Sequence, residues 1–170
     1  MGTTAQSREQ SPLETGTFAA GCFWGVEAVF RRTPGVRATT VGYAGGTLEH
    51  PSYHDVCTGT TGHAEVVQVR FDPAEVPYDE LLEVFWRSHD PTTPNRQGPD
   101  VGTQYRSAIF FHSPEQEVAA HASKARWQGR VGQPIVTEIT PASAVYPAEE
   151  DHQRYLEKRG LATCTIPSDE

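Results

Sequence analysis

The sequence lacks the features that mark several classes of protein. No run of about 18 apolar residues occurs, so no transmembrane helix is predicted. Positive charge is scarce: 14 Lys and Arg against 22 Asp and Glu give a net charge of -8, which argues against nucleic acid and anionic membrane surfaces as partners. The 3 cysteines form no CxxC pair and the 7 histidines show no metal-ligand spacing. We therefore expect no disulfide framework, no bound metal and a reducing, cytoplasmic environment.

The hydrophobic pattern predicts one domain in which strands and helices alternate. We expect a disordered leader at 1–14, a single domain at 15–160 and a flexible tail at 161–170. Strands are predicted at 17–20, 37–43, 65–71, 106–112 and 135–139, and helices after Cys22, at 78–89, from the N-cap Ser113 to about Gln128, and at 148–158. This order predicts an α+β two-layer sandwich of helices on a mixed sheet, as in the ferredoxin-like plait, with a long C-terminal coil.

The most informative segment is Gly21-Cys22-Phe23-Trp24-Gly25, because it places a cysteine at a predicted strand-to-helix turn. Backbone N–H groups without partners and the macrodipole at a helix N-terminus favour negative charge. Such a position lowers the pKa of a thiol from about 8.5 and raises the thiolate fraction. The two aromatic side chains that follow predict an apolar wall beside the sulfur. We interpret Cys22 as a nucleophile, with a buried structural cysteine as the alternative.

Four polar residues are further candidates for a site. Glu65 leads directly into an apolar strand, and a carboxylic acid partly withdrawn from water keeps its proton to higher pH and acts as an acid; a solvated carboxylate is the alternative. Asp100 and Tyr105 lie in or beside the Gly- and Pro-rich loop 91–103, whose length favours a functional loop. There and at Tyr53, a ligand contact and a purely structural role both remain open.

The two other cysteines differ in their surroundings. Cys57 lies between Val56 and Thr58, and we predict a buried, structural thiol. Cys164 lies in the polar C-terminal tail, where a mobile and accessible thiol is able to fold back onto a distant reactive cysteine.

Taken together, five segments resemble the type A peptide methionine sulfoxide reductases, which reduce the S-epimer of methionine sulfoxide. The segments are Gly21-Cys22-Phe23-Trp24-Gly25-Val26-Glu27, Val41-Gly42-Tyr43-Ala44-Gly45-Gly46, Thr61-Gly62-His63-Ala64-Glu65, His89-Asp90-Pro91 and Gly102-Thr103-Gln104-Tyr105-Arg106-Ser107. The resemblance covers roughly 17–155 and implies a repair enzyme for oxidised proteins that also accepts free methionine sulfoxide. It implies no bound cofactor and thioredoxin as the external reductant. A monomer is our default expectation.

The resemblance also implies a role for each candidate. Cys22 attacks the sulfoxide sulfur and Glu65 protonates the departing oxygen. Tyr53 and Tyr105 match phenols that hydrogen-bond this oxygen, Asp100 matches an acid that supports the site, and Phe23 and Trp24 match the wall that receives the substrate methyl group.

Recycling follows from the same resemblance. Cys22 is left as a sulfenic acid, Cys164 condenses with it to a disulfide, and thioredoxin reduces that disulfide. The approach to Cys164, residues 158–163, departs from the Gly/Asn/Tyr-rich tail of many members, and the tail holds one cysteine where some members have two. We therefore predict a single Cys22–Cys164 disulfide without a relay.

Two other functions fit parts of the pattern. The turn around Cys22 also resembles that of papain-like thiol hydrolases, with His152 far downstream, but the only Asn, Asn95, is not placed to orient a histidine. That function also gives no role to Glu65 or Cys164. A thiol-bearing interaction domain, with the aromatic residues as a docking patch, predicts no turnover and no dependence on Glu65.

Overall fold

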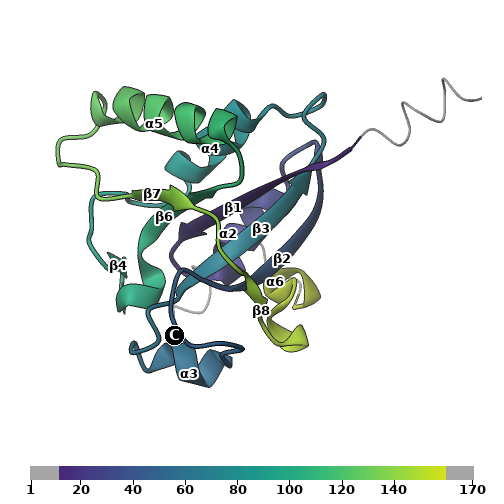
Figure 1. Ribbon diagram of the computed structural model, residues 1–170, viewed down its shortest axis with the longest axis vertical. Coiled ribbons are helices and arrows are strands. Elements are labelled where there is room, and N and C mark those ends of the chain that lie inside the picture. Colours follow the sequence, from purple (N-terminus) through teal and green to yellow (C-terminus); the bar gives the residue numbers. More distant parts are fainter. Residues whose placement is uncertain (1–11, 160–170) are drawn as a thin grey trace, which may run out of the picture.

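The computed structural model describes residues 12–159, and a mixed, six-stranded β-sheet forms its centre (Figure 1). The strand order is β7-β6-β1-β3-β2-β8, with β6 and β7 parallel and the other neighbours antiparallel. The bounds are β1 (Glu14–Ala20), β2 (Val36–Ala44), β3 (Ala64–Phe71), β6 (Ser107–Phe111), β7 (Glu138–Pro141) and β8 (Tyr146–Pro147). Most of the predicted leader and the whole predicted tail, including Cys164, lie outside the described residues.

Five helices and a small hairpin complete the described chain. The helices are α2 (Phe23–Arg31), α3 (Tyr53–Cys57), α4 (Tyr78–Arg87), α5 (Pro114–Gln128) and α6 (Tyr155–Lys158); short 3₁₀ turns are η1 (Thr103–Tyr105) and η2 (Glu150–His152). The hairpin pairs β4 (Arg96–Gln97) with β5 (Asp100–Val101) and is separate from the main sheet. The predicted α+β class with a mixed sheet and packed helices is therefore confirmed.

The two faces of the sheet carry different side chains. Large side chains face α2, α4 and α5, and Phe18 is typical: it is fully buried, with its ring 5.0 Å from that of Phe30 and 5.6 Å from that of Phe85. Burial of one such phenyl ring stabilises the fold by about 1.5–3 kcal/mol. Small residues such as Ala19 face the other way, where the segment between β7 and β8 crosses the sheet (Figure 1). The alternation along each strand thus sets the two layers.

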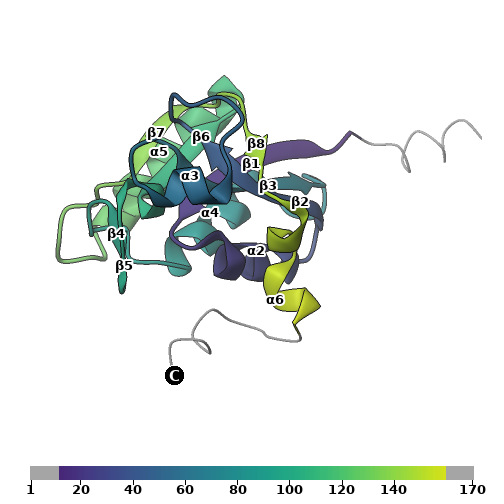
Figure 2. The ribbon, with the colours of Figure 1, turned by 90° about the horizontal axis from the view of Figure 1, so that it is seen from below.

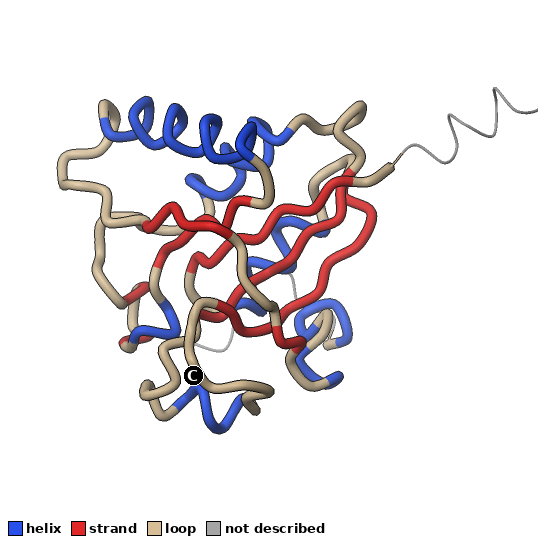
Figure 3. The backbone as a smooth tube through the Cα atoms, viewed as in Figure 1, coloured by secondary structure: helices blue, strands red, loops and turns tan. Residues whose placement is uncertain are grey.

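Loops and short helices gather at the end of the sheet where β1 ends and β3 begins (Figure 3). There α3 follows β2, and the β4–β5 hairpin lies near the start of β6. Seen from below, α2 and α6 lie side by side (Figure 2). This end of the sheet holds Cys22.

Helix α5 illustrates how local sequence determines an element. Ser113 caps it, with Oγ accepting the N–H of Gln116 at 3.2 Å, and Pro114 occupies the first turn, where a missing N–H costs nothing. Glu115 and Glu117 place negative charge near the helix N-terminus. The predicted start at Ser113 and end near Gln128 are both confirmed.

The helix predicted at 148–158 is wrong, because a long-range contact overrides the local pattern. Arg154 has a left-handed backbone (φ 52), and its N–H donates to Oε1 of Glu27 at 2.7 Å. Glu27 is buried on α2 and also accepts the hydroxyl of Thr39. This carboxylate therefore holds the chain in a conformation that ends η2 and starts α6.

A buried histidine links α4 to the sheet. The ring of His89 lies with Nδ1 2.8 Å from the carbonyl oxygen of Phe85 and Nε2 2.7 Å from Oγ of Ser107. Only a neutral imidazole donates at one nitrogen and accepts at the other. Burial lowers the pKa of His89 from 6.5 to about 4. The folded protein therefore binds this proton more weakly than the unfolded chain does.

We expect the free energy of unfolding to fall by about 3 kcal/mol as the pH drops from 6.5 to about 4. This is the free energy that corresponds to the difference between the pKa of His89 in the unfolded chain and its pKa in the folded protein. Chemical denaturation across this range checks it. A His89→Asn variant should lose this part of the pH dependence, whereas His121→Asn, at an exposed site on α5, should retain it. An unchanged pH dependence in His89→Asn would contradict the assignment.

Candidate active site

Cys22 is the N-cap residue of α2, directly after β1, so the predicted strand-to-helix turn is present. Gly21 makes the turn with φ 98, a left-handed conformation that glycine adopts without steric cost. The Cys22 side chain is half-buried, and the backbone carbonyl oxygen of Cys22 accepts the N–H of Val26 at 3.4 Å. The thiol therefore lies at the positive end of a helix and in reach of solvent.

Glu65 lies against this turn from the start of β3. Its side chain is 2 % exposed, and Oε1 accepts the backbone N–H of Phe23 at 3.1 Å. Burial raises the pKa of Glu65 well above its usual value, and the negative charges of Cys22 and Asp100 raise it further, while the Phe23 N–H opposes them. A carboxyl group in this environment keeps its proton to higher pH than a solvated one does, and it lies at the turn that carries the sulfur.

Two phenols and a second carboxyl group complete the polar side of the site. Burial raises the pKa of Tyr105, as do the charges of Glu65 and Asp100, and burial likewise raises the pKa of Tyr53. Both phenols are therefore protonated hydrogen-bond donors at neutral pH. The pKa of Asp100 is also raised by burial. Glu65 interacts electrostatically with Cys22 and with the three other polar candidates, which are Tyr53, Asp100 and Tyr105. The polar candidates therefore lie in one cluster.

The aromatic side of the site extends beyond the two predicted residues. Phe23 is buried, with its ring 6.4 Å from that of Tyr53. Trp24 is half-buried; its indole N–H donates to Nδ1 of His152 at 3.1 Å, and its ring stacks on Tyr155 at 3.7 Å. The ring of His152 also lies 4.4 Å from that of Tyr53. These aromatic rings therefore form one continuous wall.

Sequence reasoning missed His152 and Tyr155 as parts of this wall. The signal was available, because two rings three positions apart interrupt an otherwise polar segment. It also missed Glu149, whose carboxylate accepts the backbone N–H of Tyr53 at 3.1 Å and the hydroxyl of Tyr43 at 3.4 Å. The C-terminal part of the described chain thus supports both Trp24 and Tyr53.

The prediction that Cys57 is buried is wrong. Its side chain is exposed, because only Val56 of the five-residue helix α3 is buried. Partial loss of hydration is the largest cause of the raised pKa of the Cys57 thiol; the charge of Glu65 raises this pKa further, and a hydrogen bond with Tyr53 lowers it. Cys57 is therefore a free thiol at the edge of the candidate site.

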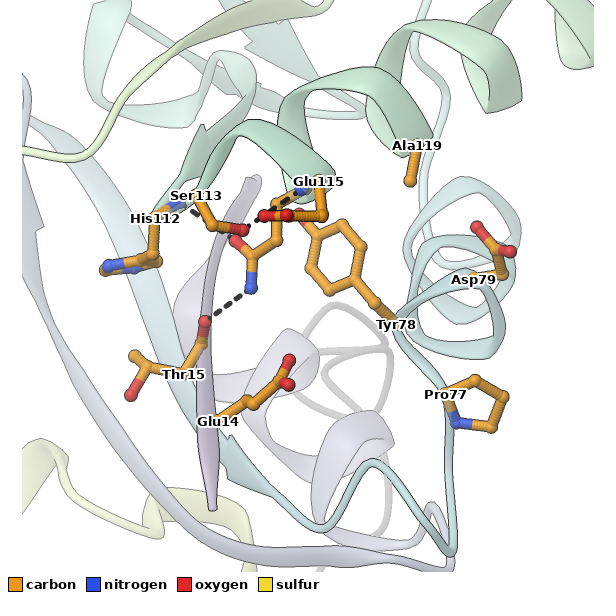
Figure 4. Close-up of a pocket in the computed structure, with 10 residues that line it drawn as sticks. Glu14, Thr15, Pro77, Tyr78, Asp79, His112, Ser113, Glu115 and Ala119 are labelled. Atoms are coloured by element: carbon orange, nitrogen blue, oxygen red, sulfur yellow. Dashed lines mark hydrogen bonds between the residues drawn. The ribbon is translucent and has the colours of Figure 1, made fainter. Parts of the chain in front are cut away.

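A separate cavity of about 600 Å³ lies where β1 begins, between α4 and α5 (Figure 4). Glu14, Tyr78, Asp79, His112 and Glu115 are among its lining residues. None of the predicted site residues lines this cavity. It lies at the beginning of β1, whereas Cys22 follows the end of β1.

In the span 12–159, no group of three or more His, Cys, Asp or Glu side chains is able to hold a metal ion, and no helix is long and apolar enough to cross a membrane.

A thiol at a helix N-terminus, a buried carboxyl group with a raised pKa and two phenols in one cluster define an enzyme of the thiol-dependent class. Comparison with known proteins identifies the family. The model of the family described as peptide methionine sulfoxide reductase matches residues 14–170. A peptide methionine sulfoxide reductase MsrA of Geobacter sulfurreducens is 63% identical over 158 residues, which cover 92% of this chain and 98% of the relative.

Solved structures agree. Mxr1 from Saccharomyces cerevisiae in reduced form superposes with a TM-score of 0.84 at 42% identity, covering 89% of this chain and 88% of Mxr1. Mxr1 in complex with Trx2 superposes with a TM-score of 0.62 at 30% identity, covering 86% of each chain. The chain belongs to the peptide methionine sulfoxide reductase family, in its A type. Its activity is that of a peptide-methionine (S)-S-oxide reductase, which excludes the thiol-hydrolase and interaction-domain interpretations.

Proposed function

We propose that Cys22 is the nucleophile and Glu65 the acid of this reductase. The thiolate of Cys22 attacks the sulfoxide sulfur, and the proton of Glu65 passes to the oxygen. The sulfur–oxygen bond of the substrate breaks as the oxygen passes to Cys22. The sulfoxide is reduced to methionine by two electrons, and the thiolate is oxidised to a sulfenic acid. The observation that carries this proposal is the hydrogen bond from Phe23 N–H to Glu65, which ties the acid to the residue next to Cys22.

The remaining site residues bind and orient the substrate. Tyr53 and Tyr105 donate hydrogen bonds to the sulfoxide oxygen, and their raised pKa values keep both phenols protonated. Asp100 supports the polar side of the site. Phe23 and Trp24 receive the methyl group on the aromatic side. Oxygen donors and a methyl pocket on different sides of the sulfur accept only one epimer, and the activity of the family makes this the S-epimer.

Recycling uses Cys164 and thioredoxin. The Cys164 thiol condenses with the Cys22 sulfenic acid, forming a disulfide and releasing water, and thioredoxin reduces this disulfide by thiol exchange. The family membership and the complex of yeast Mxr1 with the thioredoxin Trx2 support this reductant. Two cysteines that cycle between the thiol and disulfide states also fit a reducing compartment such as the cytoplasm.

We extend the proposal to the architecture. The four central strands in the order β6-β1-β3-β2, with α2 after β1 and α4 after β3, support a ferredoxin-like plait as the frame of one catalytic domain at 15–160. The tail at 161–170 supplies the resolving thiol to this frame.

A Cys164→Ser variant tests the recycling step. We expect it to release about one methionine per chain from excess methionine sulfoxide but to lose turnover driven by thioredoxin, because the sulfenic acid has no partner thiol. Methionine is quantified with and without thioredoxin and its reductase. Cys57→Ser is the matched control, since it removes the exposed thiol near the site and should keep thioredoxin-driven turnover. Turnover that persists in Cys164→Ser and disappears in the double variant would assign the resolving role to Cys57 instead.

A further inference from the structure

The side chain of Gln97 bridges the loop 90–97, which follows α4, by bonding the backbone of Asp90. Its Oε1 accepts the backbone N–H of Asp90 at 2.8 Å, and its Nε2 donates to the carbonyl oxygen of Asp90, also at 2.8 Å. A glutamine makes both bonds at once because its amide holds a donor and an acceptor. The strand β4 is therefore fixed to the residues that follow α4.

The same side chain packs against the turn that carries Cys22. A methyl group at Gly21 would lie 2.8 Å from Cγ and 2.9 Å from Cβ of Gln97, so only glycine leaves room for this approach. Gly21 is also the residue that makes the turn with a left-handed backbone. Gln97 thus touches the backbone immediately before the thiol.

Asp100 is the partner of Gln97 across the β4–β5 hairpin. Its charge acts on Glu65 and on Tyr105, which places Asp100 on the polar side of the active site. Each strand of the hairpin is only two residues long, and the hairpin is not joined to the main sheet. Such a short ribbon has little stability of its own, so its position depends on the contacts at its base.

We infer that Gln97 is a positioning residue, which holds the hairpin against the Cys22 turn and so fixes Asp100 in the active site. The inference rests on the proposed role of Asp100. Gln97 has no part in the chemistry; it connects the end of α4, the Gly21 backbone and the strand opposite Asp100. A displacement of about 1 Å at a reacting site costs up to about a hundredfold in rate, so the loss of such a contact is measurable.

The test is a Gln97→Met variant, because methionine keeps Cβ and Cγ in place and removes both hydrogen bonds. Gln128→Met is the matched control: Nε2 of Gln128 donates to the carbonyl oxygen of Gln133 at 2.9 Å and Oε1 accepts the N–H of Ile135 at 2.8 Å. These are two bonds of the same kind, and they hold the loop after α5 instead of the β4–β5 hairpin. Methionine formation is measured in a single turnover by the reduced enzyme. We expect Gln97→Met to slow it at least about tenfold and Gln128→Met less than about twofold.

Two further measurements distinguish a positioning role of Gln97 from a general structural effect. In an Asp100→Asn background, Gln97→Met should slow the reaction less than about twofold more, because the two residues act through one another. The charge of Asp100 is one cause of the raised pKa of Glu65, and the rate should fall as the pH rises through that pKa. This fall should occur at lower pH in Gln97→Met and in Asp100→Asn, and at the wild-type pH in Gln128→Met.

Three results would overturn these conclusions in distinguishable ways. A Gln97→Met enzyme at the wild-type rate contradicts the positioning role, and so does a loss that is equally large in the Asp100→Asn background. An Asp100→Asn enzyme at the full rate contradicts the proposed role of Asp100 itself, whatever the rate of Gln97→Met.

Discussion

Replacement of Cys22 by Ser is expected to lower the rate of methionine formation by at least about ten-thousand-fold, the scale seen when an essential nucleophile is removed. The helix N-terminus favours a thiolate at this position, but a serine hydroxyl does not ionise at neutral pH. Serine is slightly smaller than cysteine and is a favoured N-cap residue, so the variant should keep the turn at the start of α2. The loss is therefore chemical and not a failure to fold.

The measurement is methionine released per chain with excess methionine sulfoxide and dithiothreitol. Cys57→Ser is the control for the removal of a thiol as such, because Cys57 is exposed and lies on α3, outside the helix N-terminus that holds Cys22. It should keep most of the activity. Substantial methionine formation by Cys22→Ser, at a rate near that of Cys57→Ser, would remove Cys22 from the mechanism.

Glu65→Gln is expected to slow the same step by about 10²- to 10⁴-fold, the usual contribution of a general acid. Glutamine keeps an oxygen that accepts the Phe23 N–H but has no proton to give to the departing oxygen. Single-turnover methionine formation measures this step without recycling. A rate within a few-fold of wild type would exclude Glu65 as the acid.

The pH dependence of the rate follows from the direction of the Glu65 pKa. The group reacts when protonated, and its pKa in the folded protein is raised, so activity should fall as the pH rises through that raised value, which lies well above the usual value of a glutamic acid. Glu65→Gln should lack this alkaline limb. An alkaline limb of unchanged position in the variant would assign the limb to another group.

The same shift predicts a gain of stability in the inactive variant. The folded state holds the Glu65 proton more tightly than the unfolded chain, whose pKa is near 4.5, so this contribution is complete below pH 4.5 and is lost as the pH rises through the folded value. Glutamine carries no such penalty. Glu65→Gln should therefore have a higher Tm than wild type at pH 8, while the two proteins converge at acidic pH.

The elements that local sequence determines were predictable. Ser113 and Pro114 mark the start of α5, and the alternation after Glu65 marks β3, because caps and strand periodicity act within a few residues. The strand-to-helix turn at Cys22 was predictable for the same reason. It also gave the nucleophile of the proposal before any distance was known.

The elements that long-range contacts determine were not predictable. Arg154 breaks a predicted helix because Glu27, 127 positions earlier in the sequence, accepts its N–H. The small β4–β5 hairpin, too short to show a strand pattern, lay within a predicted loop. Cys57 follows the apolar Val56 and precedes the small residues Thr58 and Gly59, but the five-residue helix α3 at the end of the sheet leaves it exposed.

The site residues divide in the same way. Glu65 was recognisable because it lies at the beginning of an apolar strand, and burial of that strand also buries its carboxyl group. The support of Trp24 by His152 and Tyr155 was not, because it joins residues more than a hundred positions apart through ring stacking. No periodicity in the sequence reports a contact of that kind.

The most direct test of the account uses the Cys57→Ser/Cys164→Ser variant, in which Cys22 is the only thiol. The reduced protein is mixed with excess racemic methionine sulfoxide and dimedone, without external reductant, and both methionine and the mass of the Cys22 peptide are measured. The account predicts about one methionine per chain, formed from the S-epimer, and one dimedone adduct at Cys22, the mark of a sulfenic acid. Methionine formed without an adduct, or no methionine at all, would contradict transfer of the sulfoxide oxygen to Cys22.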